Sequence, residues 1–354
     1  MNKNFFYLLA LGAAIALPLF TSCNGNDDPT DETLISSEYI YVLNSGNMNS
    51  NNASLSMYDV KENTVIKDVF EAQNGRRLGD TGQDMVLYGS KIYITMTRES
   101  TVEVTDLDAK SIKQIRTEGA PRYLAVYEGK VYVTYQNGYV ARIDTGTLNV
   151  EARIQVGRNP EQLTVTNGKL YVANSGGLDY NTEAGYDKTV SVVDIASFTE
   201  TKKIEVVINP TEIESDQSGN VYVISKGNYG DIPNTLQKIH SATDAVSVME
   251  GIDGTFFTTA GNTLYSIYSQ WGATDIYYYA YDAVSDRVLS NNFIGDTKIP
   301  SPYQLNYDAA YEHLFITNSD YRNDGDVYIF DKNHTFVRKF EVGLNPMKAV
   351  YVKK

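Results

Sequence analysis

The chain has 354 residues, of which 44 are acidic and 30 are basic, for a formal net charge of −14. This balance argues against a nucleic-acid partner, because binding to phosphates needs clustered lysine and arginine. The single cysteine excludes an internal disulfide, and the 28 tyrosines favour strands.

The first 22 residues have the pattern of a secretory signal peptide. Residues 5–19 are almost wholly apolar, and two small residues stand directly before Cys23. An apolar run of this length is too short for a membrane span. Residues 19–23 resemble the bacterial lipobox, although Phe20 stands where that motif prefers leucine. The resemblance implies that Cys23 is lipidated and becomes the mature N-terminus. The protein would then be attached to the membrane by a lipid anchor only.

Residues 23–37 are predicted to be the lipidated cysteine and a flexible acidic tether. They include Asp27, Asp28, Asp31 and Glu32 and hardly any apolar side chain, so they cannot bury a core. Acidic residues behind a lipidated cysteine resemble the export signal of Bacteroidetes lipoproteins, which implies a surface-exposed position on the outer membrane. A solvated linker without a signal is the alternative.

Residues 38–354 contain a repeat that decides the predicted fold. An alternating strand centred on an aromatic residue occurs seven times, at Tyr41, Tyr93, Tyr132, Tyr171, Tyr222, Tyr265 and Phe315. The copies are 39 to 52 residues apart, and three further short strands complete each unit. The period of two excludes a helical solenoid, and so many strands cannot form one open sheet. The prediction is an all-β, seven-bladed β-propeller with four antiparallel strands per blade.

The two ends of this domain are predicted to share one blade. Residues 348–352 have the pattern of an innermost strand, but no outer strands follow them. The strands at 39–43 and 54–60, at the other end of the domain, supply what is missing. Pairing of the N- and C-terminal strands then closes the ring and leaves no open sheet edge.

The repeat phrases are similar to those of the YVTN (YncE-like) propellers. The phrases are Lys169–Asn174, Thr189–Asp194 and Val156–Pro160, and the resemblance extends over residues 39–352. It implies a propeller but says little about function, because one scaffold hosts many activities.

The two faces of the predicted disc differ in their loops. One face, the generic face, carries tight turns such as Asn167–Gly168. The other, the loop-rich face, carries the long segments 44–52, 174–188, 225–234, 269–275 and 318–325 and the crossings 74–83 and 296–304. Extra length on one face of a repeat protein usually marks the binding side. The ligand site is therefore predicted on the loop-rich face.

Tyrosine, tryptophan and arginine are the usual energetic anchors of binding sites. The predicted ligand-binding residues on the loop-rich face are Arg76, Arg77, Arg98, Arg122, Tyr135, Arg158, Tyr180, Tyr186, Tyr229, Trp271, Tyr303 and Tyr321. Trp271 is the foremost candidate, with packing on a neighbouring blade as its alternative role. The recurring loop asparagines, such as Asn44 and Asn174, are interpreted as turn residues.

No catalytic group, metal site or cofactor is predicted. The three histidines, His240, His313 and His334, fall on the generic side. The cysteine is assigned to the lipid, so neither a Ser/His/Asp nor a Cys/His arrangement can be assembled on the loop-rich face.

Several carboxylates do belong to the loop-rich face, among them Asp84, Glu161 and Glu212. A pair of them would suit acid–base chemistry, but the sequence does not show which lie together. Residues 320–326 resemble a calcium loop, except that Arg322 stands where a ligand is required.

The whole set of features resembles the cobalamin-binding (BtuG-type) propeller lipoproteins of Bacteroidetes. The resemblance implies a surface lipoprotein that binds a corrinoid and passes it to a TonB-dependent outer-membrane transporter. A corrinoid is a broad, partly apolar disc fringed with amides, which suits flat aromatic contacts and amide or arginine donors. Two alternatives stay open: a protein-interaction scaffold in an outer-membrane complex, and an enzyme acting on an extracellular carbohydrate or lactone.

Overall fold

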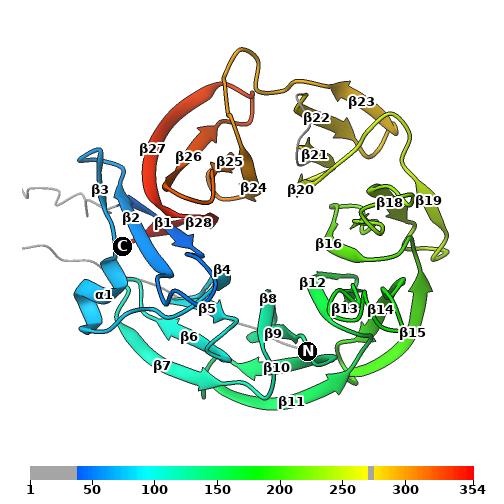
Figure 1. Cartoon of the computed structure of the whole chain (residues 1–354), viewed down its shortest axis with the longest axis horizontal. Helices are drawn as coiled ribbons and strands as arrows, with labels where there is room; N and C mark the ends of the chain where they lie inside the picture. The colour runs from blue at the N-terminus through cyan, green and yellow to red at the C-terminus, as the bar shows by residue number, and fades with distance from the viewer. Residues whose placement is uncertain (1–37, 270–274) are drawn as a thin grey trace, which may run out of the picture. The chain divides into compact units, whose positions relative to one another are not determined.

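The computed structural model describes residues 38–269 and 275–354 (Figure 1). Their 28 strands form seven four-stranded antiparallel sheets arranged as a ring, which confirms the predicted seven-bladed propeller. The predicted signal peptide, Cys23, the tether and Trp271 lie outside the described residues. Within the described ranges, no helix is long and apolar enough to cross a membrane.

Each blade runs from an innermost strand outward. Blade one consists of β28 (Pro346–Lys353), β1 (Glu38–Asn44), β2 (Ser54–Asp59) and β3 (Thr64–Ile66). Blade two is β4 (Gly82–Tyr88), β5 (Lys91–Met96), β6 (Thr101–Thr105) and β7 (Ser111–Arg116), and blade three is β8 (Pro121–Tyr127), β9 (Lys130–Tyr135), β10 (Tyr139–Asp144) and β11 (Asn149–Gln155). Blade four is β12 (Pro160–Thr166), β13 (Lys169–Asn174), β14 (Thr189–Asp194) and β15 (Thr199–Glu205), and blade five is β16 (Pro210–Ser215), β17 (Val221–Ser225), β18 (Thr235–Ile239) and β19 (Val246–Val248). Blade six is β20 (Phe256–Ala260), β21 (Thr263–Tyr268), β22 (Tyr277–Asp282) and β23 (Arg287–Ser290), and blade seven is β24 (Pro302–Asp308), β25 (His313–Asn318), β26 (Asp324–Phe330) and β27 (Phe336–Leu344).

Blade one closes the ring as the sequence predicted. β1 pairs with β2 on one side and with β28 on the other, so Tyr41 lies between Met57 and Val350. Glu38 pairs with Lys353 at the generic-face end of the two strands. The described chain therefore enters and leaves the propeller on the face opposite the long loops.

The core lies in the wedges between adjacent blades. The repeated aromatic of the second strand is fully or almost fully buried in every blade, as Tyr41, Tyr93 and Phe315 illustrate with 0% exposure. Ile40 of β1 belongs to a cluster that also contains Val327 of β26 in the neighbouring blade. Successive side chains of a strand point to opposite faces of the sheet, and both faces of an inner strand pack against a neighbouring blade. Side chains of both orientations are therefore buried in the inner strands.

A short helix in the crossing between blades one and two was not predicted. Helix α1 (Val69–Asn74) buries Val69 and Phe70 in the cluster shared by the first two blades. The Asn74 amide donates to the carbonyl of Ala109 at 2.9 Å. Six residues are too few to show a helical period in the sequence, and so short a helix is held by tertiary packing.

Replacing Ile40 with alanine should destabilise the propeller by about 2–5 kcal/mol, because a fully buried aliphatic side chain leaves a cavity at the closing blade. The matched change Ile66→Ala, on the outermost strand where the side chain is 48% exposed, should cost less than about 0.5 kcal/mol. Urea unfolding followed by circular dichroism measures both. Equal losses in the two variants would contradict the packing described for blade one.

Candidate functional site

The innermost strands carry a repeated bulge at the loop-rich end of the central channel. In β12, Pro160 faces Asn174 and Leu163 faces Val172, so three steps on β12 match two on β13. The same one-residue offset occurs near the start of β4, β8, β16, β24 and β28. A bulge re-aims the side chains beside it. In these innermost strands, the bulge turns side chains near the start of the strand toward the channel.

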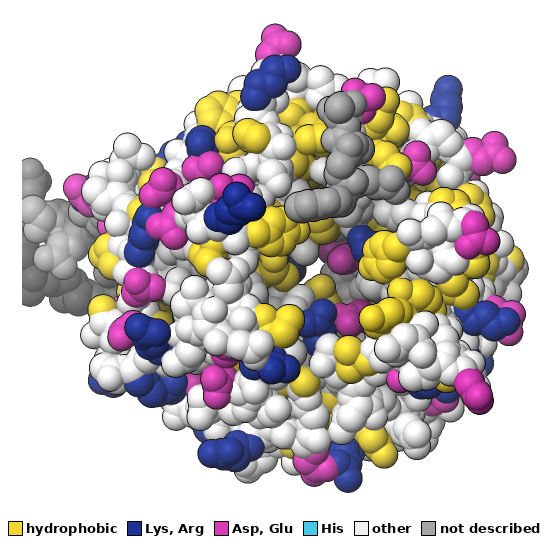
Figure 2. Space-filling view, in the orientation of Figure 1, with side chains coloured by type: hydrophobic (Ala, Val, Ile, Leu, Met, Phe, Trp, Pro, Cys, Tyr) yellow, Lys and Arg dark blue, Asp and Glu magenta, His cyan; other side chains and the backbone are white. Residues whose placement is uncertain are grey.

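The third residue of these strands, together with Phe257 of β20, forms a ring on the channel wall. Its members are Asp84, Tyr123, Gln162, Glu212, Phe257, Gln304 and Lys348. Figure 2 shows acidic and basic side chains at the central opening. The ring therefore combines charges of both signs with amides and aromatic rings, a mixture typical of sites that bind a polar ligand.

Arg122, one of the predicted ligand-binding residues, stands at the mouth of this channel. Its guanidinium donates to the Glu161 carboxylate at 2.8 Å and to the Gln83 side-chain oxygen at 2.5 Å. The three residues belong to three successive blades, so closure of the ring brings them together. Arg122 is held in place by these partners and presents only part of its donor capacity to a ligand.

Two carboxylates on the channel wall have their oxygens occupied. Asp84 accepts from the backbone amides of Met85 at 2.8 Å and Leu124 at 2.9 Å. Glu214 accepts from the backbone amide of Thr259 at 2.7 Å and from the Thr258 hydroxyl at 3.1 Å. Burial still raises the pKa of both groups.

Glu212 differs from these carboxylates. It is 8% exposed, lines the channel, and forms no hydrogen bond or ion pair with any described residue. Burial raises its pKa, while the charge of Lys226 acts in the opposite direction. Burial lowers the pKa of Lys226, whose ammonium donates to the Thr255 carbonyl and lies 5.3 Å from the centre of the Phe256 ring. A carboxylate that lines a channel without a protein partner marks a candidate functional group.

Further predicted aromatic side chains belong to blades four, five and seven. Tyr180 and Tyr186 stack with ring centres 6.3 Å apart, and Tyr229 is 77% exposed. Tyr303 and Tyr321 meet edge to face at 5.3 Å, and burial raises the pKa of Tyr303 to about 12. Tyr180, Tyr186, Tyr229 and Tyr321 lie on hairpin loops of the loop-rich face. Tyr303 was predicted in a crossing but is the second residue of β24.

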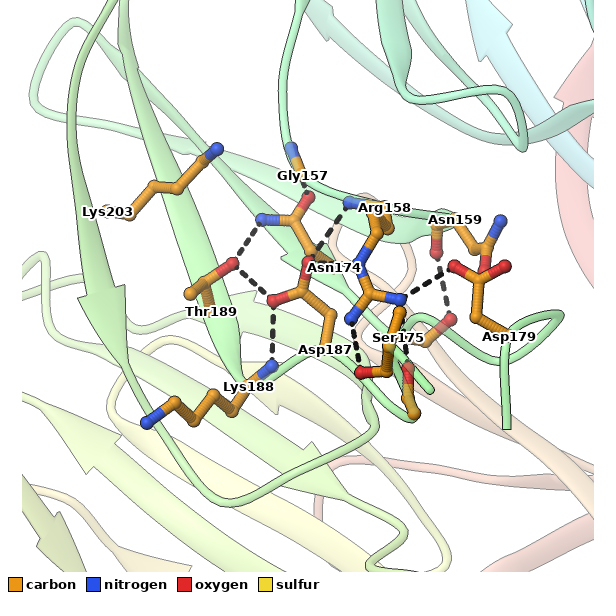
Figure 3. Close-up of polar contacts among 12 residues, drawn as sticks. Gly157, Arg158, Asn159, Asn174, Ser175, Asp179, Asp187, Lys188, Thr189 and Lys203 are labelled. Atoms are coloured by element: carbon orange, nitrogen blue, oxygen red, sulfur yellow. Dashed lines mark hydrogen bonds and ion pairs between the residues drawn. The ribbon is translucent and has the colours of Figure 1, made fainter. Parts of the chain in front are cut away.

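Arg158 stabilises the longest of these loops (Figure 3). Its guanidinium donates to the Asp179 carboxylate at 2.7 Å and to the Gly185 carbonyl at 2.9 Å, and its backbone amide donates to Asp187 at 3.1 Å. These bonds fix residues 175–188, between β13 and β14, over the end of blade four. Arg158 is thus a loop-positioning residue in this structure.

The recurring asparagine of this segment has a structural role, as interpreted, but through other partners. Asn174 accepts from the Gly157 amide at 3.1 Å and donates to Thr189 and Ser191 (Figure 3). A Cβ at Gly157 would lie 2.3 Å from the Asn174 side chain, so glycine is required there. Asn174 therefore connects the crossing before β12 with strand β14, whereas the sequence interpretation had it bonded within its own turn.

Three other predicted arginines are also bound to the protein itself. Arg76 donates to the buried Glu103 carboxylate at 2.9 Å, and Arg77 and Arg98 donate at 3.1 Å and 2.6 Å to the β1–β2 loop, at Asn51 and Asn49. Arg77 and Arg98 thus fix the β1–β2 loop of the loop-rich face. The prediction that Arg76 lies on that face is wrong, because its partners are Glu103 on β6 and Ser111 at the start of β7, toward the generic face.

Tyr135 needs a correction in position. It is the last residue of β9 rather than a loop residue, its side chain is 2% exposed, and it packs in the cluster between blades two and three. The alternation of β9 turns it inward, so it does not reach the surface of the loop-rich face.

The sequence reasoning missed Tyr123, Lys226, Lys348 and the glutamines of the ring. A signal was present: Pro121, Pro160, Pro210, Pro302 and Pro346 recur at one blade position, and the ring residue stands two positions after each of them. Proline starts an innermost strand because it donates no ladder hydrogen bond there. Aligning the blades on these prolines would have collected most of the channel ring.

No cluster of three or more His, Cys, Asp or Glu side chains suited to a metal occurs in the described part of the chain. Asp320, in the loop that resembled a calcium site, accepts the backbone amides of Arg322 and Asn323. Asp324 pairs with Lys67 at 2.7 Å, and Asp326 pairs with Lys339 at 3.1 Å.

Comparisons with known proteins agree with this architecture. A family model described as a domain of unknown function (DUF5074) matches residues 38–342. No curated protein is significantly similar in sequence.

Three solved structures illustrate the shared fold. One described as a putative 6-phosphogluconolactonase from Bacteroides uniformis has a TM-score of 0.64 at 11% identity, covering 89% of this chain and 99% of its own. Another so described, from Bacteroides fragilis, has a TM-score of 0.60 at 12% identity, covering 92% and 100%. Hydrazine synthase of Kuenenia stuttgartiensis has a TM-score of 0.59 at 14% identity, covering 78% and 89%. Identities this low show the fold alone.

Replacing Arg158 with alanine should loosen residues 175–188 without unfolding the ring, at a cost of about 1–2 kcal/mol. Amide hydrogen exchange should become faster in that segment, because the bonds from the guanidinium to Asp179, Ala184 and Gly185 are lost, while the backbone bond to Asp187 stays. The control Lys203→Ala changes a half-exposed residue of β15 and should leave exchange there unchanged. Unaltered protection in Arg158→Ala would contradict the role assigned to this side chain.

Glu212→Gln should change how stability depends on pH. Because burial raises the pKa of Glu212, the folded protein binds its proton more tightly than the unfolded chain does. Stability contributed by this proton is present below the usual glutamate pKa of about 4.3 and is lost as pH rises through the folded pKa. Relative to wild type, the variant should therefore gain stability as pH rises above about 4.3. Parallel stability curves from urea unfolding would refute this.

Proposed function

The chain belongs to the DUF5074 family, whose function is unknown, and we propose that its propeller binds a ligand on the loop-rich face, with a corrinoid as the first candidate. The observation that carries the proposal is the Glu212 carboxylate on the channel wall, which has no protein partner among the described residues, on a propeller whose loop-rich face also carries exposed tyrosines. Uncommitted polar groups in a concave, partly aromatic site are the usual signature of ligand binding.

The loop-rich face is organised before any ligand arrives. Arg158 holds the β13–β14 loop, and Arg77 and Arg98 hold the β1–β2 loop. Fixed loops reduce the entropy that binding costs. Exposed rings such as Tyr180 and Tyr229 then offer rigid aromatic area beside the polar channel.

A corrinoid suits this combination. Its apolar face would contact the tyrosines, and its peripheral amides would meet the charged and amide side chains of the channel mouth. The described histidines lie at or near the generic face, so recognition would use the edge of the corrin ring and the nucleotide tail rather than a bond to cobalt.

The proposal includes the anchor. A lipid on Cys23 would join the propeller through Glu38, on the generic face. The loop-rich face would then stay free for the ligand and for a TonB-dependent transporter in the outer membrane.

Hydrolysis of a lactone is a second candidate, favoured by one observation. Glu212 and Glu214 both line the channel wall, and burial, helped by the charges of Glu161 and Glu214, raises the pKa of Glu212. A carboxyl group with a raised pKa beside a second carboxylate suits general acid–base catalysis. If the protein releases acid from 6-phosphogluconolactone and the Glu212→Gln variant does not, the result would support lactone hydrolysis over simple ligand binding.

We expect residues 34–354 to bind cyanocobalamin tightly at a ratio of one to one in isothermal titration calorimetry. Alanine substitutions at Trp271, Tyr180 or Tyr229 should each weaken binding about tenfold or more, because aromatic anchors carry most of the energy of such sites. Val284→Ala, an exposed apolar residue of the generic face, should change nothing.

Absence of heat at high micromolar cyanocobalamin would remove the corrinoid proposal. A protein captured from detergent-solubilised outer membranes by the wild type, but not by the Tyr229→Ala variant, would then support an interaction scaffold.

A further inference from the structure

The central channel is narrowest at its ring of polar side chains. The space that the ring residues and Glu214 border, the neck, has a volume of about 20 Å³, and the stretch toward the generic face widens to about 250 Å³. Leu124, Val126 and Leu163 are among the aliphatic residues that line the wider stretch. A single water molecule needs about 10–15 Å³ of such space. The neck therefore has room for a group of about that size and for little more.

Glu212 is an acidic acceptor in the neck that the fold does not use. Asp84 accepts from the backbone amide of Leu124, and Glu214 accepts from that of Thr259. Glu212 borders the same space, is 8% exposed, and has no hydrogen bond or ion pair with any described residue. Because buried polar groups are almost always bonded, its carboxylate is suited to a partner that comes from outside the protein.

The charges around the neck favour a cation as that partner. The neck is bordered by three carboxylates, those of Asp84, Glu212 and Glu214, and by the ammonium of Lys348, which lies 3.8 Å from Asp84. Lys226 does not border the neck, and its ammonium donates to a backbone carbonyl. With both lysines counted, the three ionised carboxylates still leave one negative charge. A single positive charge balances it, and the attraction is stronger where little water screens it.

Size and oxygen donors limit the kind of cation. Gln162 and Gln304 also border the neck, so their side-chain carbonyls supply neutral oxygens. A divalent cation such as calcium takes about six to eight oxygen ligands, and no group of three or more acidic, histidine or cysteine side chains is arranged for a metal in the described ranges. Sodium, potassium and a primary ammonium group need only one charged ligand and are close to water in size.

We propose that the neck binds one small, singly charged cation, a monovalent metal ion or a primary ammonium group, with Glu212 as its charged ligand and the amide oxygen of Gln304 as a neutral one. The two ligands come from blades five and seven, so a bound cation connects opposite walls of the channel and stabilises the folded ring. The inference goes beyond the proposed function and does not depend on a corrinoid, because the cation lies inside the channel and the exposed tyrosines stay free.

Thermal unfolding of residues 34–354, in chloride salts of equal ionic strength, tests the site. Choline is too large for the neck and serves as the reference cation against sodium, potassium, ammonium and methylammonium. At least one small cation should raise the Tm of the wild type by about 2–4 °C above its value in choline, and the rise should saturate with concentration. A rise with sodium or potassium identifies a metal ion, and a rise confined to ammonium and methylammonium identifies an ammonium group.

Two substitutions at the neck should act in opposite directions. Glu212→Gln keeps the shape of the side chain and removes its charge, so the cation-dependent rise in Tm should disappear. Lys348→Met removes an ammonium that repels the cation. It should lower the concentration that gives half of the rise by about tenfold.

Asp216→Asn is the matched control. Asp216 is a buried carboxylate toward the generic face that accepts from the Tyr222 hydroxyl at 2.9 Å, so its loss should lower the Tm in every salt and preserve the cation-dependent rise. Equal Tm values of the wild type in choline and in every small cation would overturn the proposal, as would an equal rise in Glu212→Gln. Greater stabilisation by calcium than by every monovalent cation would overturn the single-charge assignment. Each of these results leaves cyanocobalamin binding, which calorimetry measures separately, unaffected.

Discussion

The pairing of β28 with β1 is the interaction on which the rest of this propeller depends. It joins the two ends of the described chain across more than three hundred residues, from Glu38 to Lys353. Without it, blade one would lack its innermost strand and would present an unpaired edge. The wedge that contains Ile40 and Val327 would also open. Because each blade packs only against its two neighbours, one open junction would leave the whole ring without closure.

Closure also creates the channel and its electrostatics. Seven innermost strands meet around one axis, and the bulge near the start of most of them turns extra side chains toward it. Carboxylates from β4, β12 and β16 are thereby placed where solvent is scarce, and burial raises the pKa of Asp84, Glu212 and Glu214. The fold satisfies most of these groups with backbone amides. Glu212 is the exception: it lines the channel without a protein partner among the described residues, and this is the physical reason to connect it with binding.

The loops of the loop-rich face are held in place by arginine side chains. From residue type alone, these side chains would be assigned to ligand binding. Arg158, Arg77 and Arg98 resemble anchors because arginine is common in binding sites. In the structure each donates to its own loops or to a neighbouring one. The tyrosines then become the exposed elements of the face, and the arginines are the reason that they stay in place.

By itself, the sequence determined the number of blades, the order of strands, the shared closing blade and the face with the long loops. These features are local: alternation, turn residues and segment lengths can be read within a single repeat. Tertiary structure alone decided that Tyr135 is buried, that Arg158 is committed to its loop, and that Glu212 and Lys226 are left with unused polar groups. Partners from different blades, such as Gln83 and Arg122, meet only when neighbouring blades pack against each other. No pattern within one repeat carries that information, because it depends on strand register and on contacts between segments far apart in the chain.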